Sequence, residues 1–138
     1  MNLQLIPVYK YYAEDPWRFL YSTDPDITSG WTRAGVSFYA FGQAQIGTVP
    51  VYRYTAPNPT RFLLSTNPDV GQGWQREGTA FHAFKEADAQ VGTTAVNQVR
   101  AIDQDPWRYQ YLTEYNTNAG PGWELDNLAF HVFDAAAA

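Results

Sequence analysis

Three short segments of the chain combine a carboxylate or amide, an aromatic or hydroxyl side chain, and an arginine at one common spacing. The three sets are Asp15, Trp17 and Arg18; Asn58, Thr60 and Arg61; and Asp105, Trp107 and Arg108. A flat aromatic face can cover the C–H surface of a sugar ring, while a carboxylate and a guanidinium hold neighbouring hydroxyl groups by charge-assisted hydrogen bonds. These residue types at this spacing predict carbohydrate binding.

The same residues also have a purely structural interpretation. Trp17 and Trp107 flank proline-containing turns, so each ring could simply shield its own turn. The arginines could pair with a turn carboxylate or stack on an aromatic ring. Thr60 takes the aromatic position in the second set, so a shared core does not require tryptophan there. We therefore expect the first and third sets to be competent sites and the second to be weaker.

Each set is joined by a residue at a further repeated position, which is Tyr39, His82 or His131. The two histidines are the only ones in the chain. Because tyrosine stands at the equivalent position in the first segment, we expect these side chains to pack or to line a site. Nucleophile, base and orienting group do not occur together, and no ligand spacing typical of a metal site is present. The sequence predicts no catalysis, no metal and no cofactor.

Composition narrows the classes of partner. The chain has 138 residues, a length that fits one compact domain, and its net charge is -5. An acidic surface repels phosphate backbones, which argues against nucleic acid as a partner. Cysteine is absent, and no long apolar run predicts insertion into a membrane. The first residues do not resemble a signal peptide, so we expect a cytoplasmic protein or one secreted without a recognisable signal.

A threefold internal repeat is the feature that must position these residues. Arg18 and Arg61 are 43 positions apart, and so are Trp31 and Trp74. We place the repeats at about residues 6–48, 49–93 and 94–134 of a single domain. Such a period indicates units that bury their apolar faces only against one another.

Each repeat is expected to contain four short strands rich in tyrosine, phenylalanine and valine. In the first of these strands the basic residues Lys10, Arg53 and Arg100 align. The segment from Trp31 to Phe41 is expected to form two strands hinged by a tight turn at Gly35. The later repeats carry Gly78 and Asn127 at that position, and both residue types tolerate positive φ.

Three such units predict an all-β domain with pseudo-threefold symmetry and about twelve strands. The favoured architecture is a β-trefoil-like barrel, and the alternative is a three-bladed propeller-like or prism-like arrangement of sheets. The tryptophan that follows glycine in each repeat and the paired phenylalanines near each repeat end are expected in the core. These residues are Trp31, Trp74, Trp123, Phe38, Phe41, Phe81, Phe84, Phe130 and Phe133.

The order of motifs resembles a known aromatic tandem repeat. The motifs are Pro-Val-Tyr-Arg-Tyr, Arg-Phe-Leu-x-Ser-Thr-(Asp/Asn)-Pro and Gly-Trp-x-x-x-Gly-x-x-Phe-x-x-Phe, and they are clearest in residues 7–93. The family they resemble has no known function and occurs on secreted bacterial hydrolases and in fungal proteins. The expected architecture is also similar to that of small fungal lectins and protease inhibitors of trefoil type.

The loop aromatics beside acidic residues and arginines favour a non-catalytic lectin with up to three related sites. Its partners would be glycans or glycoproteins, and it could form a homo-oligomer. The alternative function is a protease inhibitor that presents an exposed loop, for which the segment from Glu86 to Thr94 is the candidate. A structural or self-assembling domain is a third possibility.

Overall fold

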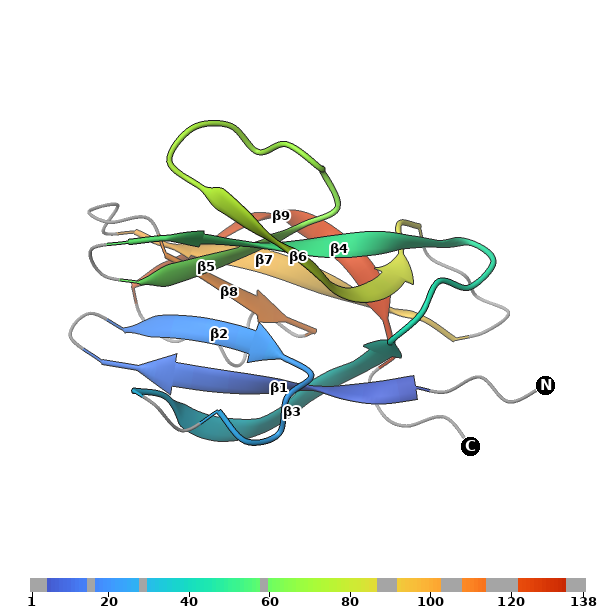
Figure 1. Ribbon diagram of the computed structural model, residues 1–138, viewed down its shortest axis with the longest axis horizontal. Coiled ribbons are helices and arrows are strands. Elements are labelled where there is room, and N and C mark those ends of the chain that lie inside the picture. The colour runs from blue at the N-terminus through green and yellow to red at the C-terminus, as the bar shows by residue number, and fades with distance from the viewer. Residues whose placement is uncertain are drawn as a thin grey trace.

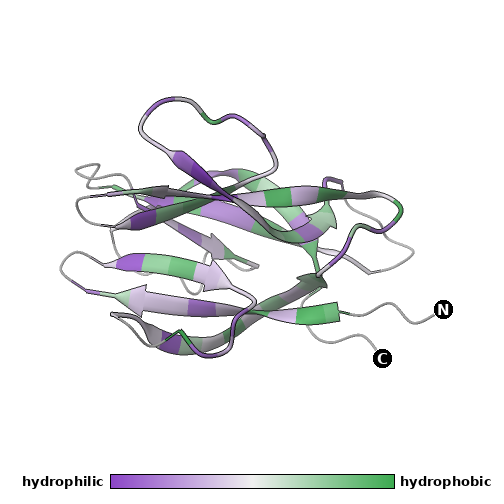
Figure 2. Cartoon of the chain, viewed as in Figure 1, coloured by the Kyte–Doolittle hydropathy of each residue, from purple (hydrophilic) through white to green (hydrophobic). Residues whose placement is uncertain are grey.

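The computed structural model describes residues 5–14, 17–27, 30–57, 60–86, 92–102, 108–113 and 122–133. These residues form nine antiparallel strands, which confirms the prediction of an all-β protein. The strands are β1 (Leu5–Ala13), β2 (Arg18–Ser22), β3 (Thr32–Phe41), β4 (Thr48–Ala56), β5 (Arg61–Ser65), β6 (Gln75–Phe84), β7 (Thr94–Ala101), β8 (Tyr109–Leu112) and β9 (Trp123–Val132). Hydrophobic and hydrophilic residues alternate along much of their length (Figure 2), as expected for strands with one buried face.

Each repeat folds as one three-stranded unit. Its first strand lies in the middle and pairs with the other two, so β1 lies between β2 and β3, β4 between β5 and β6, and β7 between β8 and β9. We call these units repeat 1, repeat 2 and repeat 3. In Figure 1 repeat 1 lies below repeat 2, and repeat 3 lies behind them.

The pairing register corrects one feature of the sequence alignment. Lys10 is opposite Gly35, and Arg53 is opposite Gly78. In repeat 3 the residue opposite Asn127 is Gln98. Arg100 lies two positions further along β7, so its alignment with Lys10 and Arg53 was wrong. The central strand of repeat 3 therefore carries a neutral amide where the others carry a cation.

The expected turn at Gly35 is also absent, since β3 is one continuous strand. Gly35 and Gly78 do adopt positive φ, at 121° and 134°, as their residue type predicted. The backbone shifts register on both sides of Gly35, where Ala34 and Ser37 are left without a partner on β1. These are β-bulges, which bend and twist a strand without ending it. The two strands expected here are therefore one, so the nine described strands fall short of the twelve predicted.

The three units meet through short pairings near the ends of β3, β6 and β9. Phe41 pairs with His82, Phe84 pairs with His131, and an isolated bridge joins Tyr39 to Phe133. The main strand path, β2-β1-β3-β6-β9-β7-β8, is open. The described strands do not form the closed trefoil barrel that the repeat count favoured.

Two layers of phenylalanine lie where the units meet, and the predicted core position is confirmed for all of them except Phe84, which is only partly buried. The ring centroids of Phe38, Phe81 and Phe130 are 5.6 to 6.0 Å apart. Those of Phe41, Phe84 and Phe133 are 5.8 to 6.1 Å apart. All six pairs meet edge to face, the favourable geometry for aromatic quadrupoles. One residue from each repeat thus completes each layer, which ties the fold to the threefold repeat.

Tyrosine hydroxyls add polar links between the second strands. The buried Tyr21 hydroxyl accepts from the backbone N–H of Tyr111 at 2.9 Å. The Tyr111 hydroxyl accepts from the N–H of Leu64 at 2.8 Å, and its single proton lies between two acceptors, Gln98 Oε1 at 2.6 Å and the Leu64 carbonyl at 3.0 Å. Repeat 2 has Leu64 at the position of these tyrosines, so it offers no hydroxyl for a third link.

Candidate functional site: three clefts between the repeats

Equivalent clefts separate each repeat from one neighbour. Three features line each cleft. The first is the lysine, arginine or glutamine in the middle of a repeat's central strand (β1, β4 or β7), and the second is the bulge in that repeat's third strand (β3, β6 or β9). The third is the end of the second strand (β8, β2 or β5) of the neighbouring repeat. Cleft 1 contains Lys10, Gly35 and Thr113; cleft 2 contains Arg53, Gly78 and Thr23; and cleft 3 contains Gln98, Asn127 and Thr66. These three clefts are therefore formed between repeats.

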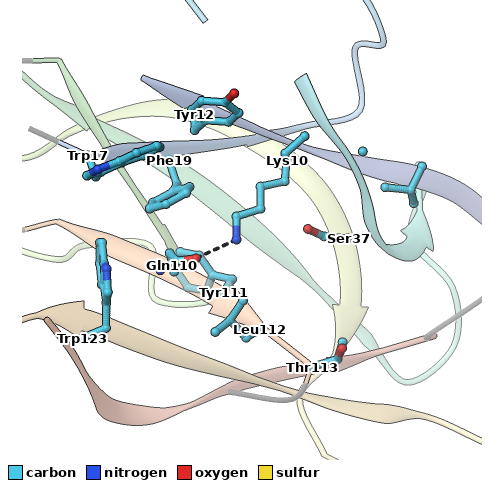
Figure 3. A pocket seen from close by; sticks show the side chains of 13 residues that line it. Lys10, Tyr12, Trp17, Phe19, Ser37, Gln110, Tyr111, Leu112, Thr113 and Trp123 are labelled. Carbon is cyan, nitrogen blue, oxygen red and sulfur yellow. Dashed lines mark hydrogen bonds between the residues drawn. The ribbon is translucent and has the colours of Figure 1, made fainter. Parts of the chain in front are cut away.

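Cleft 1 is the largest of these three, with a volume of about 740 Å³, against about 170 Å³ for cleft 2 and about 350 Å³ for cleft 3. Figure 3 shows its lining from close by. Trp17, Phe19 and Trp123 lie on one side of this view, Lys10 and Gln110 lie in the middle, and Ser37 and Thr113 lie on the other side (Figure 3). The aromatic residues are Tyr12, Trp17, Phe19, Tyr111 and Trp123, and the polar ones include Lys10, Ser37, Gln110 and Thr113.

Trp17 is the exposed member of the aromatic group. Its side chain is 48% exposed although it packs on Tyr12 and Phe19, with ring centroids 5.4 and 6.4 Å away. Trp123 from repeat 3 meets Phe19 edge to face at 5.5 Å. In repeat 2 the residues equivalent to Tyr12 and Trp17 are Thr55 and Thr60, and both line a hollow beside Trp74. The aromatic wall is therefore a feature of repeat 1 that repeat 2 lacks.

Lys10 reaches across cleft 1 from β1 to β8 (Figure 3). Its ammonium donates to Gln110 Oε1 at 2.6 Å and lies 4.6 Å from the centre of the Phe19 ring. Burial of the charge lowers the pKa of Lys10 from 10.5 to about 8. At neutral pH this side chain is still a cation, held mostly out of water by aromatic rings and one amide.

In each of the other two clefts a carboxylate of the same repeat already contacts the central-strand side chain. In cleft 2 Arg53 Nε lies 2.8 Å from Glu77 Oε1. In cleft 3 Gln98 Nε2 donates to Asp126 Oδ2 at 2.6 Å. These internal contacts occupy the polar groups that a ligand would otherwise use.

Arg18, Arg61 and Arg108 lie where the first two strands of each repeat are connected, and we call them the hairpin arginines. They were candidate ligand-binding residues, but they contact neighbouring parts of the protein. Arg18, Arg61 and Arg108 lie 5.4 to 6.0 Å from the ring centres of the tryptophans Trp31, Trp74 and Trp123. Arg18 Nη1 donates to the Thr60 carbonyl at 3.1 Å, and Arg108 Nη1 donates to the Trp17 carbonyl at 3.2 Å. These bonds join the hairpin of one repeat to the hairpin of the next.

The tryptophans beneath these arginines pack across the repeat boundaries. Trp31 meets Phe62 at 5.7 Å, Trp74 meets Tyr109 at 6.1 Å, and Trp123 meets Phe19 at 5.5 Å. Their packing role was predicted, but the prediction placed them in the shared core, whereas they are only partly buried and lie at the boundaries between repeats. Trp17 and Arg18, adjacent in sequence, consequently face different neighbours: Trp17 lines the cleft towards repeat 3, and Arg18 bonds repeat 2.

The structure does not bring Tyr39, His82 or His131 into the three clefts. These residues lie opposite Pro7, Pro50 and Ala95, at the other end of the central strands from the hairpins. The distance along β1 from Pro7 to Ala13, where the hairpin begins, is about 20 Å at the usual rise of a strand. Among the described residues, the buried His82 Nδ1 has no hydrogen-bond partner.

Several predicted residues fall outside the part of the chain that the structure describes. They are Asp15, Asn58, Asp105 and Trp107, together with residues 87–91 of the proposed inhibitory loop. Sequence reasoning also missed Lys10, Gln110 and Ser37 as lining of one cleft. Lys10 was noticed only as an aligned basic residue, and its contact with Gln110 spans 100 positions. No local pattern indicates such a contact.

Within the described ranges, no cluster of three histidine, aspartate or glutamate side chains could hold a metal ion. The same ranges contain no helix long and apolar enough to span a membrane. The family described as a domain of unknown function (DUF5648) matches residues 2–84, which comprise most of the first two repeats. No curated protein and no solved structure matches the chain.

Proposed function

The chain therefore belongs to the DUF5648 family, and from its own clefts we propose that it is a non-catalytic lectin whose main site is cleft 1. The observation that carries the proposal is the exposed Trp17 ring beside the polar groups of Lys10 and Gln110. Its partners are glycans or glycoproteins.

Cleft 1 has the two kinds of surface that a sugar requires. A pyranose ring presents C–H groups on its faces and hydroxyl groups around its edge. Trp17 offers a flat apolar face, while Ser37 and Thr113 offer hydroxyl groups and Lys10 offers an ammonium group. A volume of about 740 Å³ also suits a small saccharide, since ligand pockets usually measure roughly 300–1,000 Å³.

The three-unit construction favours a prism-like arrangement of sheets over a trefoil barrel. Three equivalent clefts around one rigid body would allow several weak contacts with a multivalent glycan surface, which raises avidity. Clefts 2 and 3 are smaller, and Glu77 and Asp126 already contact their central side chains, Arg53 and Gln98. We therefore assign them weaker binding than cleft 1, and the hairpin arginines a role in positioning the hairpins that border the clefts.

A glycan array followed by calorimetry with the best glycan tests this function. Trp17→Ala should weaken binding by roughly tenfold or more, since aromatic contacts of this kind contribute about 1–2 kcal/mol. Ile46→Ala is the matched control, because Ile46 is fully exposed and is not among the residues that line cleft 1. Equal binding by both variants would reject cleft 1 as the site. Absence of binding to any glycan would reject the lectin function.

A further inference from the structure

The three clefts differ in their central-strand residue and also at the position that precedes the glycine or asparagine of each bulge. Glu77 precedes Gly78 in the bulge of β6, and Asp126 precedes Asn127 in that of β9. Each of these carboxylates contacts the central-strand residue of its own cleft, at 2.8 Å from Arg53 and 2.6 Å from Gln98. The equivalent residue of cleft 1, which precedes Gly35, is Ala34. Cleft 1 therefore lacks the carboxylate that the other two supply themselves.

Lys10 has no substitute for this missing carboxylate among the described residues. No carboxylate in those ranges forms an ion pair with its ammonium, which bonds to the neutral amide of Gln110 and faces the Phe19 ring. An ammonium has three N–H donors, and Gln110 accepts from one of them. A buried cation without a counter-ion is unfavourable, and a carboxylate brought by a ligand would remove that cost.

The space in front of Lys10 is accessible to such a ligand. Ala34 is exposed and, like Lys10, lines the open cleft. Its side chain is a single methyl group, shorter than the glutamate and aspartate side chains at the equivalent positions of the other repeats. The aromatic wall of Tyr12, Trp17 and Trp123 lines the same cleft.

We propose that cleft 1 selects an acidic sugar, whose ring carboxylate takes the place left by Ala34 and pairs with Lys10. The proposal rests on the lectin function and names its class of ligand: a saccharide with a carboxylate on the ring, such as a uronic acid. The carboxylate would accept hydrogen bonds from Lys10, and the ring would lie against the exposed face of Trp17. Neutral sugars could contact the aromatic side chains but would leave the Lys10 ammonium without a carboxylate partner.

Calorimetry with methyl β-D-glucuronide and methyl β-D-glucoside tests the assignment, because the two probes differ only at the carboxylate. The wild type should bind the glucuronide at least about tenfold more tightly, as expected for one charge-assisted hydrogen-bonded pair. Ala34→Glu places a carboxylate on the protein, while Ala34→Gln has nearly the same shape without the charge. Glucuronide affinity should fall about tenfold or more further in Ala34→Glu than in Ala34→Gln, and glucoside affinity should be equal in the two variants.

Lys10→Met provides a second route to the same answer if Ala34→Glu fails to fold. This variant should bind the two sugars with similar affinity. Equal wild-type affinity for both sugars would overturn the acidic assignment and leave the lectin function in place. Binding of acetate as tightly as glucuronide would overturn the sugar class, because the carboxylate alone would then account for binding. If the wild type binds no glycan at all, the lectin function itself is rejected.

Discussion

Replacing Lys10 by methionine should make the domain more stable at neutral pH, although it removes a hydrogen bond. Burial holds the pKa of Lys10 at about 8 in the folded protein, against 10.5 for the exposed side chain. This difference corresponds to roughly 3 kcal/mol of unfavourable charge burial at pH 7. Loss of the bond to Gln110 and of the contact with the Phe19 ring offsets about 1–2 kcal/mol of it. We expect a net gain of about 1–2 kcal/mol.

The pH dependence of this gain distinguishes charge burial from better packing. The cost in the wild type is fully present below about pH 8, where Lys10 is protonated in both states. It disappears as the pH rises towards 10.5, because the unfolded chain then also loses the proton. The stability difference between Lys10→Met and wild type should therefore shrink between pH 8 and 10.5. Tyrosine titration is common to both proteins and cancels in the difference.

Urea denaturation of both proteins at several pH values between 6.5 and 10.5 measures this difference. Arg53→Met is the matched control, because Arg53 is the equivalent residue of repeat 2 but is paired with Glu77. Its difference from wild type should not change over this range, since a guanidinium does not titrate there. A Lys10→Met protein less stable than wild type at pH 7, or a difference that is constant with pH, would refute the reasoning.

Two other measurable properties depend on the Tyr111 hydroxyl and on the charge of Lys10. Tyr111→Phe should destabilise the domain by about 1–3 kcal/mol in urea denaturation, because it leaves the buried N–H of Leu64 and Oε1 of Gln98 without their partner; unchanged stability would show that these links are dispensable. Glucuronide affinity measured by calorimetry should decrease as the pH rises above about 8, because Lys10 loses its charge. Among the described residues near its ammonium, Tyr21 and Tyr111 are buried, and this burial raises the pKa of both, so these two side chains stay neutral over this range. An affinity that is constant to pH 10 would contradict the pairing with Lys10.

The threefold repeat and its core could be predicted because they depend on local patterns. Each repeat carries its own Phe-x-x-Phe end, and one residue from each repeat builds each aromatic layer. Positive φ at Gly35 was likewise predictable from the exchange with asparagine. The structural role of Gly35 could not be predicted, because a β-bulge and a turn require the same backbone conformation.

The site could be predicted only in part, because it forms between repeats that are distant in sequence. Trp17 stood out because Thr60 replaces it in repeat 2. Its partners in cleft 1 include Gln110 and Trp123 from repeat 3, which no spacing within a repeat connects to it. The role of Ala34 was hidden for another reason. Its meaning comes from the carboxylates at the two equivalent positions, Glu77 and Asp126, and their contacts with Arg53 and Gln98 are visible only in the structure.

The central claim is that a glycan binds in cleft 1, and the tryptophan indole N–H signals in a ¹H–¹⁵N NMR titration test it most directly. Trp17 and Trp123 line this cleft, whereas Trp31 and Trp74 do not. On addition of methyl β-D-glucuronide, we expect the signals of Trp17 and Trp123 to shift together and those of Trp31 and Trp74 to stay in place. Shifts confined to Trp31 and Trp74, or no shift of Trp17 at saturating sugar, would contradict the account.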